Sequence, residues 1–237
     1  MNDSTVDAQT IATAIAQVRE RIAAAADRVG RDATTVRLMA VSKTQPPEAY
    51  GNTAAAGLAL FGENRVQEIQ AKHHALPPGA ELHLIGHLQR NKVRAVLPLV
   101  DCIQSIDRPS VVASIANAAE QLRTAPLPVF LEVNPAKDPA KHGVDTIDAL
   151  LALAEAVAAQ STMHAVGLMT IAPFVPDERV VRTVFAQTRS WAEQLAARDL
   201  LPSRPQLSMG MTGDFGWAIA EGSTLVRIGT ALYGARS

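Results

Sequence analysis

Several features that would point to a particular class of protein are scarce or missing in this sequence. Cys102 is the only cysteine among 237 residues, which excludes an internal disulfide and a thiolate metal cluster. The formal net charge is only −1. Neither nucleic acid nor an anionic membrane is therefore expected as an obligatory partner.

Long apolar runs are also missing. No segment approaches the roughly 18 uninterrupted apolar residues of a membrane span. The first residues, MNDSTVDAQ, have neither the basic region nor the apolar stretch of a signal peptide. Hydrophobic residues nevertheless make up 48% and charged residues 19%, enough for a sizeable core. We therefore expect a folded, cytoplasmic protein with no membrane partner.

The chain begins with a helical pattern and continues with short apolar runs. Ile11, Ile15, Val18 and Ile22 fall on one helical face, and Gly30 is a plausible end for this helix. The strand candidates that follow are residues 35–42, 58–63, 82–86, 102–106, 128–134, 164–170, 206–210 and 225–234. The helix candidates between them are residues 48–57, 64–75, 90–97, 109–122, 145–160, 178–198 and 214–221.

The strand candidates are nearly continuous in apolar residues, which is typical of parallel strands covered on both faces. Such strands, alternating with helices, favour a closed (β/α)8 TIM barrel, which typically needs about 250 residues. A doubly wound open sheet is the alternative. It usually has a Gly-rich turn after its first strand, whereas this turn reads SKTQPP. We expect one domain over residues 1–237, with residues 1–30 packing on or beside the barrel.

Function in such barrels gathers where strands end and their loops begin. Glycines and hydroxyls are densest after the seventh and eighth strands, in SMGMTGD and RIGT. These loops are typical of a phosphate site, because backbone N–H groups can approach the anion and a helix N-terminus favours its charge. Lys43 ends the first strand, where a partly desolvated amine could attack the aldehyde of such a phosphorylated ligand. A lysine reaching into solvent is the alternative.

Arg227 is the second unusual strand residue. Alternation places Leu225, Arg227 and Gly229 on one face, with Val226 and Ile228 on the other. A buried guanidinium needs a partner. The sequence leaves two possibilities open: a structural ion pair with Glu132, or a hydrogen bond to a ring nitrogen of a ligand.

A set of motifs extends in order from about residue 35 to the C-terminus. They read AVSKT, FGENRVQE, HLIGHLQRNK, IQSID, LEVN with KHG, GLMTIAP, LSMGMTGD and GSTLVRIGTALYGAR. In these motifs the sequence resembles the YggS/PROSC family of pyridoxal 5′-phosphate-binding proteins. That family has the barrel of alanine racemase without the second domain of that enzyme.

The resemblance implies that Lys43 carries pyridoxal 5′-phosphate as a Schiff base. It implies that Ser208, Gly229 and Thr230 hold the phosphate and that Arg227 faces the pyridine nitrogen. Other expected cofactor-binding residues are Asn64, His83, Met169, Gly210, Met211 and Thr212. The role of the segment around Lys141 and Gly143 does not follow from the sequence.

The implied function is to hold and release pyridoxal phosphate in vitamin B6 and amino-acid homeostasis, without efficient catalysis. An arginine facing the ring nitrogen keeps it unprotonated, which weakens the ring as an electron sink. A racemase also needs a second base. Alanine racemase takes a tyrosine from a second domain, which we expect to be absent because the sequence ends at Ser237 after the last strand. Neither Tyr50 nor Tyr233 is an obvious substitute.

A pyridoxal phosphate-dependent racemase is the main alternative, and an aldolase acting on a sugar phosphate through Lys43 is another. Cofactor-accepting apo-enzymes are possible partners, and we expect a monomer. His83 and His87 would share no helical face, so no metal site is expected. His73 and His74, beside Lys72, are interpreted as part of a solvated helix face, and Lys141 as a solvated loop residue.

Overall fold

The computed structural model describes residues 7–234. Residues 1–6 of the expected N-terminal segment and residues 235–237 of the expected domain lie outside the described residues. In the described part, eight parallel strands form a closed barrel in chain order, with the first paired to the last. The expected TIM barrel is therefore confirmed. Its strands are β1 (Arg37–Val41), β2 (Leu60–Glu63), β3 (Glu81–Leu84), β4 (Cys102–Ile106), β5 (Leu127–Val133), β6 (Met163–Thr170), β7 (Gln206–Ser208) and β8 (Leu225–Ile228).

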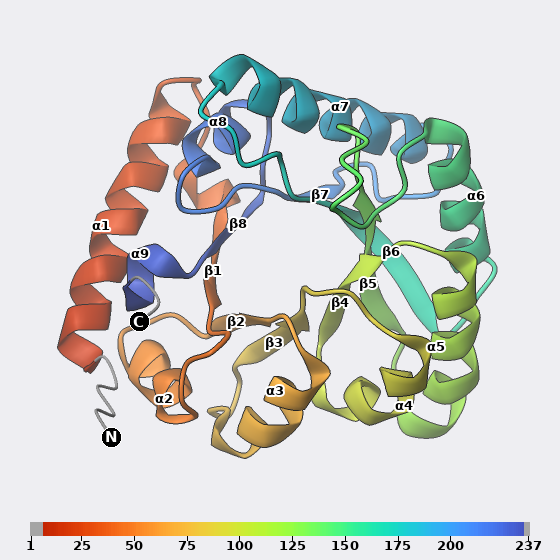
Figure 1. Ribbon diagram of the computed structural model, residues 1–237, viewed down its shortest axis with the longest axis horizontal. Helices are drawn as coiled ribbons and strands as arrows, with labels where there is room; N and C mark the ends of the chain where they lie inside the picture. Colours follow the sequence, from red (N-terminus) through yellow and green to blue (C-terminus); the bar gives the residue numbers. More distant parts are fainter. Residues whose placement is uncertain (1–6, 235–237) are drawn as a thin grey trace.

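Helices surround this barrel (Figure 1). The α-helices are α1 (Ala8–Asp27), α2 (Glu48–Ala55), α3 (Val66–Lys72), α4 (Val93–Val96), α5 (Pro109–Leu122), α6 (Ile147–Ala158), α7 (Glu178–Ala196), α8 (Phe215–Ala220) and α9 (Thr230–Tyr233). Short 3-10 turns are η1 (Ala33–Thr35), η2 (His73–Ala75), η3 (Arg90–Lys92) and η4 (Leu97–Leu99). None of the helices in residues 7–234 combines the length and apolarity needed to cross a lipid bilayer.

The extra N-terminal helix lies beside α2, α8 and α9 at one side of the barrel (Figure 1). Asp7 caps α1 by accepting a hydrogen bond from the backbone N–H of Thr10 at 2.9 Å. The buried face contains the isoleucines and valine that the helical spacing predicts. Just after the helix, Arg31 donates to the backbone oxygens of Ile219 at 2.6 Å and Ser223 at 2.9 Å. These bonds fasten α8 to the N-terminal segment.

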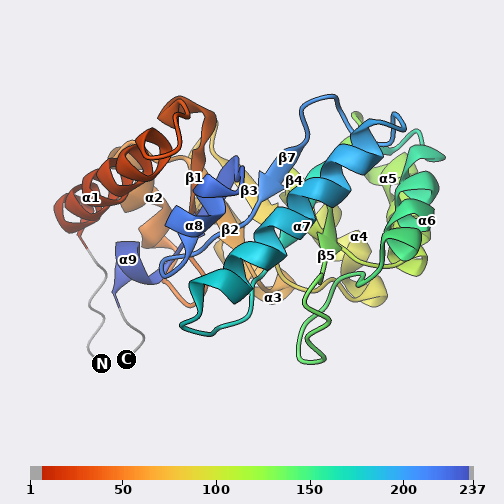
Figure 2. The same cartoon turned by 90° about the horizontal axis from the view of Figure 1, so that it is seen from above.

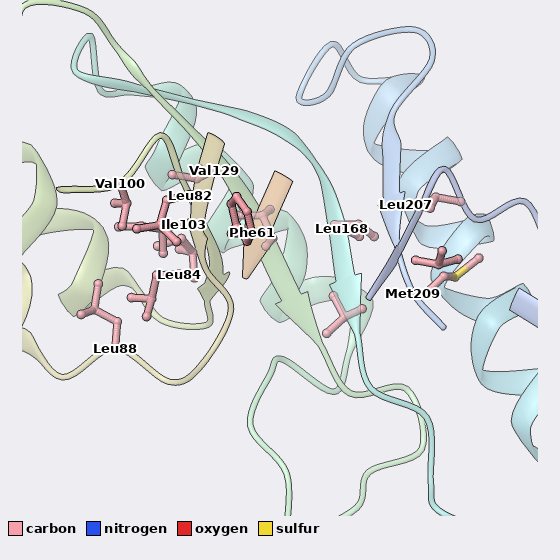
Figure 3. Close-up of a cluster of buried hydrophobic side chains, with 14 of the residues drawn as sticks. Phe61, Leu82, Leu84, Leu88, Val100, Ile103, Val129, Leu168, Leu207 and Met209 are labelled. Atoms are coloured by element: carbon pink, nitrogen blue, oxygen red, sulfur yellow. The ribbon is translucent and has the colours of Figure 1, made fainter. Parts of the chain in front are cut away.

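Two apolar layers fill the molecule. Outward strand residues such as Phe61, Leu82 and Leu168 pack under the helices (Figure 3). The barrel interior contains Met39, Val41, Leu60, Ile85, Cys102, Phe130, Met169 and Leu225. Leu225 lies in this interior cluster, whereas Val226 and Ile228 lie in the outer one, so the predicted alternation of β8 is confirmed.

The last strand is shorter than predicted. Residues 225–234 were expected to form one strand, but β8 ends at Ile228 and the short helix α9 follows. At Gly229 the backbone leaves the extended region, with φ −116° and ψ −72°. The turn lets Leu232 and Tyr233 become buried beside α1 instead of extending beyond the barrel.

Candidate functional site

One end of the barrel holds a cavity of about 740 Å³, which we call the mouth cavity. It is formed mainly by residues at or after the carboxyl ends of the strands, the end where sites of this fold are built. The loop between β5 and α6 contributes Ala140, Lys141 and His142 to its lining, and this loop projects from the body of the barrel (green in Figure 2). Its volume lies within the range of small-molecule sites, roughly 300–1,000 Å³.

Most of the residues singled out in the sequence line this cavity, although they come from distant parts of the chain. Seven do so: Lys43, Asn64, Met211, Thr212, Arg227, Gly229 and Thr230. The other four, His83, Met169, Ser208 and Gly210, are not among the lining residues. Lys43 follows β1, while Gly229 is the N-cap of α9 and Thr230 its first residue, after the neighbouring strand β8.

His83 and Ser208 belong to a hydrogen-bonded row inside the barrel, below the cavity. Nδ1 of His83 lies 2.9 Å from Nε2 of Gln104. Oε1 of Gln104 accepts a hydrogen bond of 2.6 Å from the hydroxyl of Ser208. That hydroxyl accepts in turn from Nη1 of Arg227 at 2.7 Å. In this arrangement Ser208 holds Arg227, and its contact with a phosphate stays a prediction.

Arg227 connects this row to the cavity. Its Nη1 also donates to the backbone oxygen of Ser208 at 2.6 Å, and its Nη2 donates to that of Thr170 at 2.8 Å. Burial lowers the pKa of Arg227 to about 10, so the guanidinium stays protonated at neutral pH. Three of its five N–H donors are used by the described residues, so two remain for a ligand.

The alternative partner for Arg227, Glu132, forms no ion pair with it among the described residues. Glu132 is only 6% exposed, and its Oε2 has no hydrogen-bond partner within residues 7–234. Burial raises the pKa of Glu132 to about 7, and the nearby charge of Asp107 adds to this effect. Glu132 lines the mouth cavity, so it offers a bound molecule a carboxyl group that titrates near neutral pH.

Lys72 is buried, so the interpretation of its helix face as solvated is wrong at this residue. It is only 5% exposed, and its Nζ donates to Oε1 of the fully buried Glu63 and to the backbone oxygen of Ser42 at 2.9 Å. Tyr50 also donates to Oε1 of Glu63, at 3.0 Å. No sequence pattern indicated this cluster, because α3 and the end of β1 meet only in the folded barrel.

The structure gives the KHG segment a role. Nζ of Lys141 donates to the backbone oxygens of Ala172 at 2.6 Å and Ile171 at 3.1 Å, so this lysine links the loops after β5 and β6. The interpretation of Lys141 as a solvated residue is therefore wrong. Gly143 has φ +105°, and a Cβ there would lie 2.8 Å from the backbone carbon of Val133. Only glycine suits this close, left-handed contact.

A similar close approach explains Gly210. Its φ is +98°, and an added Cβ would lie 2.7 Å from Cβ of Ala218 and 2.9 Å from Cα of Phe215. Asp214 holds the same loop by accepting from the backbone N–H of Met211 at 2.6 Å. Burial raises the pKa of Asp214, and its bond to Met211 opposes that shift. The loop after β7 is thus packed directly on α8.

His87, Asp107 and His142 were not recognised as a group in the sequence. One ligand atom of each lies within 4.8 Å of the others at the edge of the cavity. The two imidazole rings are stacked, with centroids 3.9 Å apart and planes at 20°. Nitrogen lone pairs lie in the ring plane, so those of stacked rings run side by side and do not converge on one ion. We therefore assign this group no metal.

Comparison with known proteins agrees with this geometry. Residues 14–237 match the family described as alanine racemase, N-terminal domain. A pyridoxal phosphate homeostasis protein of Aquifex aeolicus is 39% identical over 94% of this chain and 96% of the relative. One from Pseudomonas aeruginosa is 42% identical over 96% of each.

A solved structure shares the fold at similar identity. PipY of Synechococcus elongatus, solved with pyridoxal phosphate bound, superposes with a TM-score of 0.83 at 33% identity, covering 94% of this chain and 100% of PipY. The chain therefore belongs to the alanine racemase N-terminal domain family, and within it to the group of pyridoxal phosphate homeostasis proteins.

Proposed function

We propose that the protein binds pyridoxal 5′-phosphate in the mouth cavity, attaches it reversibly to Lys43, and acts in cytoplasmic vitamin B6 and amino-acid homeostasis rather than as an efficient enzyme. One observation carries the proposal. The amine-bearing Lys43, the guanidinium of Arg227 and the first residues of α9 line a single cavity. Relatives matched over nearly their whole length carry the homeostasis name, and PipY was solved with this cofactor bound.

The residues present fit the chemical groups of this cofactor. When bound, the cofactor would supply an aldehyde. Lys43, at the end of β1, would supply the primary amine that condenses with it reversibly, with loss of water. Gly229 and Thr230 would hold the phosphate, because the first N–H groups of a helix have no partner within it. The hydroxyls of Thr230 and Thr212 add further donors to the same cavity.

Arg227 would face the ring nitrogen with its remaining N–H donors. A protonated guanidinium there keeps that nitrogen unprotonated, and the ring then accepts electrons poorly. The tyrosines offer no second base. The hydroxyl of Tyr233 lies 2.9 Å from Oγ1 of Thr53, and burial raises the pKa of Tyr233 to about 12. Tyr50 is buried on Glu63.

We further propose that the chain acts as a monomer and that the open mouth lets amines or cofactor-accepting apo-enzymes take the ligand from Lys43. Reversibility of the C=N bond supports such a transfer, because water or another amine can attack the same carbon. Size-exclusion chromatography coupled to light scattering tests the monomer. Activation of an apo-enzyme by the loaded protein, after free cofactor has been removed, tests the transfer.

The proposal is tested by adding pyridoxal phosphate to the purified protein and recording its absorbance, and then by incubating the loaded protein with single amino-acid enantiomers. The expected results are a stoichiometric spectral change and no racemisation at ordinary enzymatic rates. Racemisation at such rates would support the racemase instead, with His87 at the cavity edge as the candidate base. A protein whose spectrum does not change would contradict cofactor binding itself.

A further inference from the structure

The chain on both sides of Lys43 is held by side chains from the β2–α3 unit. Before it, the backbone oxygen of Ser42 accepts from Nζ of Lys72 at 2.9 Å, and the hydroxyl of Ser42 donates to Oε1 of Glu63 at 2.7 Å. After it, the backbone N–H of Thr44 donates to Oε2 of Glu68 at 2.8 Å. We call Glu63, Glu68 and Lys72 the Lys43 clamp.

The backbone that the clamp holds is strained. Thr44 has φ +66°, although it is neither glycine nor asparagine. A β-branched residue rarely adopts this conformation, and it persists only where the surroundings hold it in place. Glu68 bonds directly to the N–H of this residue, so the strained turn and the clamp coincide.

The clamp is also a connected charged unit. Glu63 is fully buried and Lys72 is 5% exposed, and Nζ of Lys72 lies 3.7 Å from Oε2 of Glu68. Lys72 therefore joins the anchor before Lys43 to the anchor after it. Buried ion pairs are weak evidence of stabilisation, and fixing one geometry is their better-attested use.

We propose that the clamp is a positioning device that sets the direction in which the side chain of Lys43 leaves the end of β1. The inference rests on the proposed function, in which Nζ must meet the aldehyde carbon of a ligand whose phosphate is held at α9. Bond formation of this kind depends on how well the reacting atoms are held in place. Glu68, Glu63 and Lys72 act through the backbone of Ser42 and Thr44 and are positioning residues.

Glu68 allows the sharpest test, because its side chain is 23% exposed and its replacement leaves the buried Glu63–Lys72 pair intact. Glu68→Ala removes the acceptor for the N–H of Thr44. Glu68→Gln keeps an acceptor oxygen. The nearby Lys72 cation favours the orientation in which the amide oxygen, and not the NH₂ group, takes the place of Oε2. Both variants lose the same negative charge, so a difference between them does not come from charge, and exchange at the Thr44 amide then identifies the hydrogen bond.

Three measurements are made on each variant. Borohydride reduction gives the fraction of bound pyridoxal phosphate attached to Lys43. Binding of pyridoxine 5′-phosphate, which has an alcohol in place of the aldehyde, reports the cavity without the covalent step. Amide hydrogen exchange at Thr44, followed by NMR in the protein without added ligand, reports the clamp itself.

Glu68→Ala should lower the equilibrium constant for attachment by roughly three- to tenfold, with Glu68→Gln close to wild type. Affinity for pyridoxine 5′-phosphate should stay within about twofold in both variants, and exchange at Thr44 should be faster only in Glu68→Ala. Equal attachment in Glu68→Ala and wild type would overturn the proposal. So would equal losses in the two variants, or a parallel loss of pyridoxine 5′-phosphate binding.

Failure of the proposed function gives a different pattern. In that case wild-type protein forms no adduct at Lys43, and the clamp is judged on hydrogen exchange alone. If the Thr44 amide is protected from exchange in wild type and in Glu68→Gln but not in Glu68→Ala, the clamp fixes this turn for another reaction of Lys43. Unchanged exchange in Glu68→Ala would contradict the clamp whatever the ligand.

Discussion

The guanidinium of Arg227 and the hydroxyl of Ser208 lie 2.7 Å apart on neighbouring strands of the barrel interior. Because that hydroxyl also donates to Gln104, the arginine is held by a row that extends to His83 below the cavity. A ligand ring above Arg227 would therefore meet a guanidinium whose position is fixed before binding.

Arg227→Lys tests how much this arrangement contributes to stability. One ammonium cannot replace the forked donors that reach the backbone oxygens of both Ser208 and Thr170. We expect the free energy of unfolding to fall by about 2–4 kcal/mol, because buried acceptors lose their donors. Arg37→Lys is the control, since Arg37 is 44% exposed in its ion pair with Glu81 and its replacement should cost less than about 1 kcal/mol. Equal decreases in the free energy of unfolding of the two variants, measured by urea unfolding, would contradict a stabilising role for the Arg227 hydrogen bonds.

Glu132 should make stability depend on pH. Burial raises the pKa of its carboxyl from 4.5 to about 7, so the folded state keeps a proton that the unfolded state releases earlier. The stabilising effect of the buried neutral acid is complete below pH 4.5 and is lost as the pH rises to about 7. The free energy of unfolding should fall by up to about 3 kcal/mol across this window.

Comparison with Glu132→Gln isolates this effect, since glutamine does not titrate and the other buried acids are unchanged. The stability of the variant relative to wild type should be greater at pH 8 than at pH 5, as measured by urea unfolding at both pH values. Parallel pH profiles for the two proteins would contradict the raised pKa, because they would show that Glu132 binds protons equally in the folded and unfolded states.

Gly143→Ala, in the loop between β5 and α6, should lower the free energy of unfolding by more than the unfavourable φ alone would. The new Cβ would meet the backbone of Val133 at 2.8 Å in addition to adopting φ +105°. We expect a loss of about 3 kcal/mol. Gly79→Ala is the matched control, because Gly79 has φ +78° but nothing within 4 Å of an added Cβ, and about 1 kcal/mol is expected. Equal melting-temperature shifts would rule out the contact.

The barrel and much of its mouth could be predicted from the sequence, because both follow from local patterns. Continuous apolar runs predicted the parallel strands, and alternation along residues 225–228 put Leu225 and Arg227 on one face. The structure shows that this face points into the barrel, because Leu225 belongs to the interior cluster and Arg227 is buried. Depth along the axis was harder to predict. His83 precedes the cavity-lining Ile85 by two residues, so it lies on the same face but one step further from the cavity, because a strand rises about 3.3 Å per residue.

The Lys43 clamp could not be predicted at all. Its contacts join Ser42 and Thr44 to residues more than 20 positions away, and they depend on how α3 packs after β2 closes beside β1. Lys72 carries no local signal that separates a buried lysine from a solvated one at a helix end. Only the three-dimensional packing distinguishes the two.

The central claim is that Lys43 is the residue to which pyridoxal phosphate becomes attached. Borohydride reduction of the loaded protein, followed by peptide mapping, tests it most directly, with Lys141, the other lysine that lines the mouth cavity, as an internal comparison. We predict one adduct, on Lys43, that Lys43→Ala abolishes while weak binding through the phosphate remains. An adduct on Lys141 or elsewhere, or none at all, would contradict the account.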